Sequence, residues 1–352
     1  MRLILINYST NPSSLVFSHQ RETLLALTKH FESIHVFTPD PSSELLPDNV
    51  KVSKIAWKQN SVFVNAFRLY KSLIPTLIKS QNVVVFSHMT DVHAALISPL
   101  TWILRIRHVL WYAHATNSIY LVWSSFFVSQ IVSSTKGSCN LRINRGKVRF
   151  INQGISKSEF PFISRDSFEL TKFFYYGRLD PSKNIHLLLE LVKQFNDFLS
   201  PISIDIYGNP AKSNSTKYLE NLKTQLTTQN LNSQFKFRGP IKRASVSNVA
   251  RDYGVFINLF TGSLDKTLIE ATFLGIPVIT WNEEYCAQFG TWSAKPAKTS
   301  LNFIIEEIQS LKKLHSRDIQ TEIYSRQSKA IESHAFEDWI ERLVCVLKEK
   351  GK

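Results

Sequence analysis

Short apolar runs alternate with amphipathic segments along almost the whole chain of 352 residues. In the first half, the apolar runs are 3–6, 34–37, 83–86, 109–112, 130–133 and 148–151. Runs of this kind are typical of parallel strands that are buried on both faces. Apolar residues three and four positions apart predict helices at 20–31, 62–74 and 92–104, with Pro75 ending the second and Pro99 bending the third. This order predicts a doubly wound α/β domain.

A second series of the same kind follows a polar stretch at 154–165, which is the predicted linker. Its apolar runs are 173–176, 202–207, 235–237, 255–259 and 278–280, again separated by helical segments. The simplest architecture is two Rossmann-like domains, 1–163 and 164–329, followed by an amphipathic helix within 330–352. A single larger doubly wound domain is the alternative.

The segment 262–279 combines a polar loop, a short helix and a buried strand. Asp265 suits the cap of the helix, Gly275 suits the left-handed position after its last turn, and Pro277 prevents its continuation. At the carboxyl edge of a parallel sheet, the free N–H groups and the dipole of such a helix favour an anion, assisted here by Lys266. Glu270 follows about one turn later, within reach of ribose hydroxyls. The segment therefore predicts a site for a nucleotide diphosphate.

This segment resembles the donor-site motif of retaining glycosyltransferases of the two-Rossmann-domain (GT-B) type, most closely glycosyltransferase family 4, or glycosyl transferases group 1. Two further motifs carry the resemblance: Tyr176-Gly-Arg-Leu-Asp-Pro-Ser-Lys-Asn184, and the pair of strand ends at 204–208 and 235–240. The similarity is clearest from 173 to 281, whereas the first half matches mainly in its order of elements. It implies two Rossmann-like domains facing a central cleft, with the last helix crossing back to the first domain.

The resemblance also implies roles for individual residues. Arg178 and Lys183 are the predicted catalytic cations, because fixed positive charge stabilises a leaving phosphate, although cations are also common on exposed helix starts. His114 stands where the family carries a cleft-facing histidine near the reaction centre, and a purely structural role is the alternative. His88 and Asp91 are predicted on the acceptor side. The predicted donor-binding residues are Gly177, Gly208, Gly239, Pro240, Ile241, Ser263, Asp265, Lys266, Thr267 and Glu270.

One departure from the family pattern falls inside the donor motif. The family has two glutamates eight positions apart, the first against the donor sugar and the second against the ribose, whereas this chain has Gly262 and Glu270. Asp265 or backbone amides of the loop can replace the missing carboxylate, but a helix cap is an equally good use of that Asp. The turn 239–241 would present backbone groups to the nucleobase, and it can equally be a simple turn.

The expected chemistry follows from these residues. No pair of carboxylates near His114 suggests a double displacement through a covalent glycosyl-enzyme. We therefore expect a front-face transfer that retains the donor's configuration, in which the departing phosphate takes the acceptor proton. Fixed cations supply the charge stabilisation in this scheme, so we expect neither a metal nor a cofactor.

The formal net charge of +14 is unevenly placed, and no carboxylate occurs between Asp91 and Glu159. Such a positive field suits an anionic membrane surface, a phosphate-bearing acceptor or nucleic acid, while solubility alone is the plain alternative. We expect no nucleic acid, because no nucleic-acid-binding motif accompanies the charge. An apolar stripe with basic neighbours on the predicted helix 62–74 comprises Phe63, Phe67, Tyr70, Ile74, Arg68 and Lys71. It suits an anionic bilayer, and core packing explains the same spacing about as well.

The run 3–6 is too short for a signal peptide, and the run 94–104 is stopped by Arg105 and Arg107 well short of a membrane span. The 3 cysteines are far apart and fit a reducing compartment. We expect a cytoplasmic protein, soluble or peripheral on the inner face of the membrane. It would move a sugar from a UDP-, GDP- or ADP-linked donor to a glycan or lipid-linked acceptor, in cell-surface polysaccharide biosynthesis. The alternatives are a nucleotide-sugar-binding protein without catalysis and a basic membrane- or nucleic-acid-binding protein.

Overall fold

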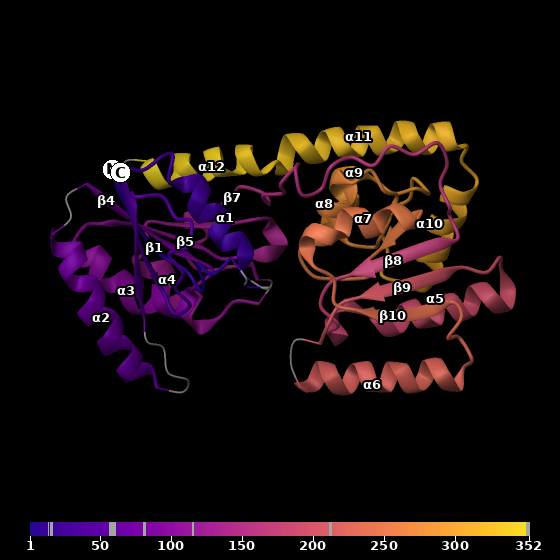
Figure 1. Cartoon of the computed structure of the whole chain (residues 1–352), viewed down its shortest axis with the longest axis horizontal. Coiled ribbons are helices and arrows are strands. Elements are labelled where there is room, and N and C mark those ends of the chain that lie inside the picture. Colours follow the sequence, from indigo (N-terminus) through magenta and orange to yellow (C-terminus); the bar gives the residue numbers. More distant parts are fainter. Residues whose placement is uncertain are drawn as a thin grey trace. The chain divides into compact units, whose positions relative to one another are not determined.

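The computed structural model of the chain describes residues 1–12, 14, 17–55, 61–79, 82–114, 116–210 and 213–349. It contains two compact α/β units, which are coloured along the chain in Figure 1. The first unit comprises Met1–Gly154 together with the chain from Glu337 onward, and the second comprises Ile155–Phe336. Each unit is described by itself. No helix in the described part of the chain is both long and apolar enough to cross a bilayer.

The first unit is built on a parallel sheet with the strand order β3-β2-β1-β4-β5-β6-β7. The strands are β1 (Arg2–Ile6), β2 (Ser33–Thr38), β3 (Val50–Lys54), β4 (Val83–His88), β5 (Arg107–Trp111), β6 (Gln130–Ser133) and β7 (Val148–Phe150). The helices are α1 (Ser18–Leu27), α2 (Val62–Lys79), α3 (Asp91–Ile103), α4 (Ile119–Phe127) and α12 (Phe336–Lys348). In Figure 1, α2, α3 and α4 lie on one side of this sheet, and α1 and α12 lie on the other.

The predicted elements of the first unit miss helix α4 (Ile119–Phe127) and differ from the observed ones in two further places. Strand β3 was not predicted, because its residues Val50 and Val52 alternate with exposed or half-exposed polar residues, as in an edge strand, and form no apolar run. The prediction that Pro75 ends its helix is wrong, since α2 continues to Lys79. Pro75 is exposed, and a proline removes only a local part of the helical hydrogen bonding. Pro99 likewise lies inside α3.

The second unit has a five-stranded parallel sheet with the order β10-β9-β8-β11-β12. The strands are β8 (Lys172–Tyr176), β9 (Ser203–Tyr207), β10 (Phe235–Gly239), β11 (Val255–Ile257) and β12 (Val278–Ile279). The helices are α5 (Ile185–Phe198), α6 (Ser213–Thr228), α7 (Val246–Val249), α8 (Lys266–Phe273), α9 (Glu283–Phe289), α10 (Leu301–Lys312) and α11 (Ser316–His334).

The alternation of side chains along β8 shows that its sheet is buried on both faces. Phe173 and Tyr175 belong to the core cluster that also contains residues of α5, α6 and α10. Phe174 and Tyr176 belong to a second cluster with residues of α7, α8 and α9. All four side chains are buried, which explains the continuous apolar run that predicted this strand.

The chain passes from one unit to the other earlier than the predicted boundary at 163. The division falls after Gly154, because Phe160 and Ile163 are buried in the core of the second unit. The predicted amphipathic helix from 330 onward is interrupted at Ala335, whose backbone is extended and forms a bridge with Ile155. Two helices result, of which α12 belongs to the first unit.

Candidate functional site

The second unit has a topological switch point at the carboxyl end of its central strand. From β8 the chain continues to β9 on one side, while β11 pairs with the other side of β8. In open parallel sheets, ligands bind in the crevice outside the strand ends at such a point. Here the segment 177–183 follows β8, and the loop 258–265 connects β11 to α8. These segments contain Gly177, Ser263 and Asp265 of the predicted donor-binding residues, together with the predicted catalytic cations Arg178 and Lys183.

Three of the predicted donor-binding residues stand at the carboxyl ends of strands: Gly177 at β8, Gly208 at β9 and Gly239 at β10. The Gly208 N–H donates to the Gly239 carbonyl at 2.8 Å, and the Gly177 N–H donates to the Tyr207 carbonyl at 3.0 Å. A Cβ atom on Gly208 would lie 1.9 Å from the carbonyl oxygen of Gly177, and its φ is 155°. Only glycine allows two strand ends to approach this closely. The three strand ends therefore meet through backbone atoms at this edge of the sheet.

Lys183 is held against the start of α8 by Asp265. Its Nζ lies 2.5 Å from Asp265 Oδ2 and 3.7 Å from the centre of the Phe260 ring. Both charged side chains are nearly buried, at 9% and 13% exposed. Lys183 ends a short 3-10 turn, Pro181–Lys183, which precedes α5. The two segments that the sequence predicted to share one ligand thus meet at a buried ion pair.

Asp265 caps α8, as its position predicted. Its Oδ1 accepts a hydrogen bond from the Thr267 N–H at 3.3 Å, and its Oδ2 accepts one from Asn258 Nδ2 at 3.0 Å. Asn258 Nδ2 also donates to Thr267 Oγ1 at 3.0 Å. Burial alone would raise the pKa of Asp265, but the charge and hydrogen bond of Lys183 outweigh it and hold the pKa below its ordinary value. The carboxylate therefore stays ionised beside Lys183.

The loop before α8 is shaped by Phe260, and this explains the glycine at the position of the first family glutamate. A Cβ atom on Gly262 would lie 2.1 Å from the Phe260 ring, so the ring occupies the space that a side chain at 262 needs. Asn282 Nδ2 donates to the Gly262 carbonyl at 2.9 Å and to the Ser263 carbonyl at 3.3 Å. Lys266 is the first residue of α8 and is half-buried. The Phe260 ring and the hydrogen bonds from Asn282 therefore fix the conformation of the loop.

Glu270 is 2% exposed, and both of its carboxylate oxygens accept hydrogen bonds. Tyr176 Oη donates to Oε2 at 2.8 Å, and Arg243 Nη1 donates to Oε1. Arg243 also donates through Nε to Glu159 Oε2 at 2.7 Å. Burial alone lowers the pKa of Arg243, but the two carboxylates outweigh it and raise that pKa. Sequence reasoning missed Arg243, although a buried glutamate needs a cation and this Arg follows the predicted turn 239–241.

The remaining donor-side residues are more exposed. The Arg178 side chain is 70% exposed, and its Nε lies 3.8 Å from Asp180 Oδ2. Pro240 is exposed, and Ile241 packs against the core cluster that contains Tyr176. Arg178 is therefore the member of the predicted cation pair that is held least, and its long side chain can reorient toward a ligand.

In the first unit, the switch point lies between β1 and β4, and His88 and Asp91 stand there. His88 is the last residue of β4, is 2% exposed and stacks on Phe86 with 5.4 Å between ring centres. Asp91 is the first residue of α3, and its Oδ2 accepts a hydrogen bond from Ser118 Oγ at 2.5 Å. His114 follows β5, is exposed, and has its ring 5.3 Å from that of Tyr112. The burial of His88 gives it a packing role as well.

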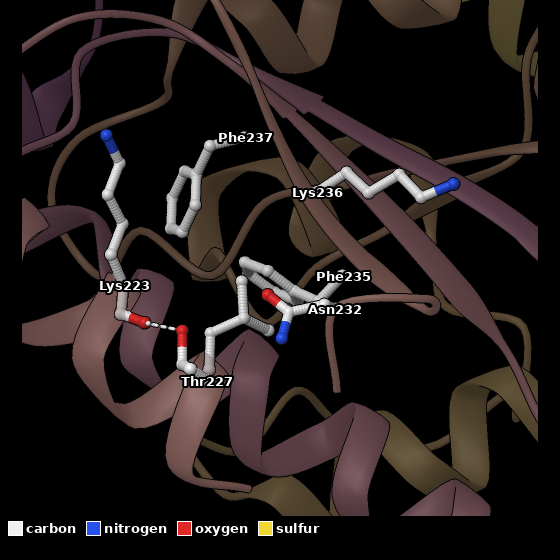
Figure 2. A pocket seen from close by; sticks show the side chains of 7 residues that line it. Lys223, Thr227, Asn232, Phe235, Lys236 and Phe237 are labelled. Carbon is white, nitrogen blue, oxygen red and sulfur yellow. Dashed lines mark hydrogen bonds between the residues drawn. The ribbon is translucent and has the colours of Figure 1, made fainter. Parts of the chain in front are cut away.

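A hollow in the second unit, drawn in Figure 2, lies away from the predicted donor residues. It is lined by Lys223, Leu226, Thr227, Asn232, Phe235, Lys236 and Phe237. Phe235 begins β10, so this hollow borders the amino end of that strand, whereas the donor residues follow the carboxyl ends. Among the described residues, no group of three or more His, Cys, Asp and Glu side chains is arranged to hold a metal ion.

The comparisons with known proteins concern the family and the fold. Residues 157–289 match the family model of Glycosyl transferases group 1. No curated protein is significantly similar to the chain in sequence. Among solved structures, Anabaena HepE in complex with UDP and glucose has a TM-score of 0.74 at 14% identity, with 99% of this chain and 100% of that chain covered.

Two further structures have the same fold. Sucrose-phosphate synthase from Thermosynechococcus elongatus has a TM-score of 0.74 at 14% identity, and 98% of each chain is covered. A glycosyltransferase from Rickettsia africae has a TM-score of 0.75 at 12% identity, with 99% of this chain and 97% of that chain covered. The fold is that of GT-B glycosyltransferases, with two Rossmann-like units, as the sequence predicted.

Proposed function

We propose that this chain, whose residues 157–289 are a match to Glycosyl transferases group 1, is a retaining glycosyltransferase. It transfers a sugar from a nucleoside diphosphate to a glycan or lipid-linked acceptor. The observation that carries the proposal is the Lys183–Asp265 pair, 2.5 Å apart at the amino end of α8 and at the switch point of the sheet. This arrangement places a nearly buried cation at the amino end of α8, where the helix dipole also favours an anion such as a diphosphate.

Binding of the donor follows from the charges at this point. A diphosphate carries more negative charge than the Asp265 carboxylate and can therefore replace it as the partner of Lys183. The dipole of α8 and the charge of Lys266 act in the same direction. Arg178, with its exposed side chain, completes the set by moving onto the phosphate oxygens, where a guanidinium can donate two hydrogen bonds. These cations then stabilise the charge that develops on the leaving phosphate.

In this scheme, α8 and the turn after β10 hold the nucleoside. Glu270 accepts hydrogen bonds from the ribose hydroxyls, and Arg243 keeps that carboxylate in place through its second contact with Glu159. The turn at Gly239, Pro240 and Ile241 supplies backbone groups to the base. Arg243 is a positioning residue in this scheme, since it acts on the nucleotide through Glu270.

The transfer takes place on one face of the sugar. The bond from the sugar's anomeric carbon to the phosphate oxygen breaks, the acceptor oxygen bonds to that carbon, and the departing phosphate takes the acceptor proton. Retention of configuration follows from this course. His114, which binds a donor hydroxyl, and His88 and Asp91, on the acceptor side, are the contributions of the first unit. Fixed cations carry the charge, so no metal or cofactor has a step in this scheme.

The acceptor belongs to cell-surface polysaccharide assembly in this proposal, and the protein works in the cytoplasm, at the inner face of the membrane. The support is the net charge of +14 and the carboxylate-free stretch after Asp91, which suit a phosphate-bearing or lipid-linked acceptor. The donor carries UDP, GDP or ADP. Nucleic acid is not a partner in this scheme.

A second function is favoured by one specific observation. Phe260 fills the place of the side chain that would contact the donor sugar at position 262, and a nucleotide-sugar-binding protein without catalysis could tolerate this change. In the transferase, the Ser263 amide takes over the contact.

One experiment tests both functions. The protein is incubated with UDP-, GDP- and ADP-sugars, with and without glycan and polyprenyl-phosphate acceptors, and the released nucleotide is measured. We expect acceptor-dependent release from one donor, and an anomeric configuration in the product that matches the donor by NMR. Binding of a nucleotide without any release would favour the non-catalytic protein, and an inverted product would contradict the proposed mechanism.

A further inference from the structure

Large apolar side chains are exposed together on α3, on α4 and on the loop before β7. Five of them are Trp102 at 62% exposed, Ile103 at 67%, Trp123 at 51%, Phe126 at 50% and Ile143 at 51%. We call these five residues the aromatic face. Monomeric soluble proteins seldom expose tryptophan and phenylalanine in one place, so such a group indicates a surface that is covered in use.

Two members of the aromatic face, Trp102 and Trp123, lie close to the same ring. The Phe127 ring lies 6.1 Å from the Trp102 ring and 5.1 Å from the Trp123 ring, and so joins α3 to α4. Lys147 Nζ donates to the Phe126 carbonyl at 3.1 Å and to two other carbonyls at the end of α4, which fixes the loop with Ile143 at this end. The face thus joins α3 to α4, and Lys147 anchors the loop that carries Ile143 to the end of α4.

Charge around the aromatic face is of one sign. Arg105 follows α3, and Arg142 and Arg145 stand on the loop with Ile143, all with exposed side chains. The sequence has no carboxylate from residue 92 to residue 158, which includes every one of these segments. Exposed aromatic rings bordered by arginines, with no acidic residue among them, are complementary to lipid headgroups and to the upper acyl region of an anionic bilayer.

Helix α2, for which the sequence left a membrane role and core packing as equal alternatives, fits less well. Its residues Leu69, Leu73 and Leu77 face the core, and Tyr70 is half-buried, with its Oη donating to the Leu96 carbonyl at 2.5 Å. Phe67 is exposed at 68%, and the side chain of Phe63 lies outside the described residues. Of the described members of the predicted stripe, Tyr70 and Ile74 are thus half-buried and Phe67 is exposed.

We infer that the aromatic face docks on an anionic bilayer, with Trp102, Trp123 and Phe126 entering the headgroup region and the three arginines contacting lipid phosphates. The Trp123 ring N–H donates to the Ala95 carbonyl at 3.1 Å, so the exposed part of this ring is carbon and loses no hydrogen bond on insertion. The inference deepens the proposed function, since a lipid-linked acceptor lies at that surface, but the binding itself requires no donor.

The test is sedimentation of the protein with vesicles of phosphatidylcholine alone and of phosphatidylcholine with phosphatidylglycerol, without nucleotide. We expect preferential binding to the anionic vesicles. Trp102→Ser with Phe126→Ser should weaken this binding by about tenfold or more, whereas Phe198→Ser, which removes an 82% exposed phenylalanine from the second unit, should leave it unchanged. Arg142→Gln with Arg145→Gln should weaken it by about fivefold for each charge and abolish the preference for anionic lipid.

Each variant is also titrated with UDP, GDP and ADP. Nucleotide binding by a variant that no longer binds lipid shows that the variant is folded and that its loss of lipid binding is separate from the transferase proposal. Equal vesicle binding by the protein and by both face variants would overturn the inference. Self-association of the protein that the Trp102→Ser and Phe126→Ser variant abolishes, with no vesicle binding by either, would overturn it as well and assign the face to a contact between two copies.

Discussion

Replacing Lys183 by methionine removes one partner of a buried ion pair and leaves the Asp265 carboxylate with only Asn258 and the Thr267 N–H as donors. The two side chains are 9% and 13% exposed, so breaking the pair should cost about 3 kcal/mol. For a unit of this size, that corresponds to a fall of about 6 to 12 °C in its melting temperature. We also expect turnover to fall by about a hundredfold, because a cation is lost from the leaving phosphate.

A second variant separates these two effects. In Lys183→Met with Asp265→Asn, no unpaired charge remains, and the asparagine still caps α8, so most of the stability should return while turnover stays low. Asp265→Asn alone keeps the cation and should retain nucleotide affinity. Differential scanning calorimetry and initial rates of nucleotide release measure the two quantities. Recovery of turnover together with stability in the double variant would refute the reasoning and leave the pair a purely structural role.

Three further results are expected. Arg243→Gln leaves the carboxylate of Glu270 buried with one donor, so nucleotide affinity should fall about tenfold in calorimetry, and Arg243→Lys should restore part of it; unchanged affinity in both would remove Arg243 from the site. Gly208→Ala should cost about 2–4 kcal/mol of unfolding free energy in urea melts, against less than about 0.5 for Gly146→Ala, where a Cβ meets nothing within 4 Å; equal costs would refute the close approach of the strand ends. Burial lowers the pKa of His108 from 6.5 to about 3, so its imidazole is neutral in the folded state and protonates only on unfolding; the unfolding free energy should therefore fall as the pH drops from about 6.5 toward 3, and His108→Gln should flatten this slope.

The fold was predictable because both sheets are parallel and buried on both faces. The apolar runs at 3–6 and 173–176 mark the central strands directly, since every second side chain in them meets a helix layer on one side of the sheet. The same criterion failed for β3, which lies at an edge and keeps polar residues between Val50 and Val52. It also could not find the break at Ala335, because the pattern of apolar residues continues through it, and the bridge to Ile155 decides the conformation.

The candidate site was predictable where a local backbone rule applies. Asp265 and Gly275 were recognisable as cap and left-handed residue from their spacing, and they occupy those positions, with φ of 71° at Gly275. The pairing of Lys183 with Asp265, the contact of Arg243 with Glu270 and the ring of Phe260 in the space at position 262 were not. These contacts join segments that are far apart in the chain or depend on side-chain packing, and no local spacing encodes them.

The most direct test of the account is a calorimetric titration of the protein with UDP, GDP and ADP, repeated with Lys183→Met. The account predicts that one of the three nucleoside diphosphates binds with a stoichiometry of one, and that the variant binds it about a hundredfold more weakly, a loss of about 2.7 kcal/mol. Absence of binding by all three, or equal affinity in the protein and the variant, would contradict the claim that the crevice between β8 and β11 holds a diphosphate.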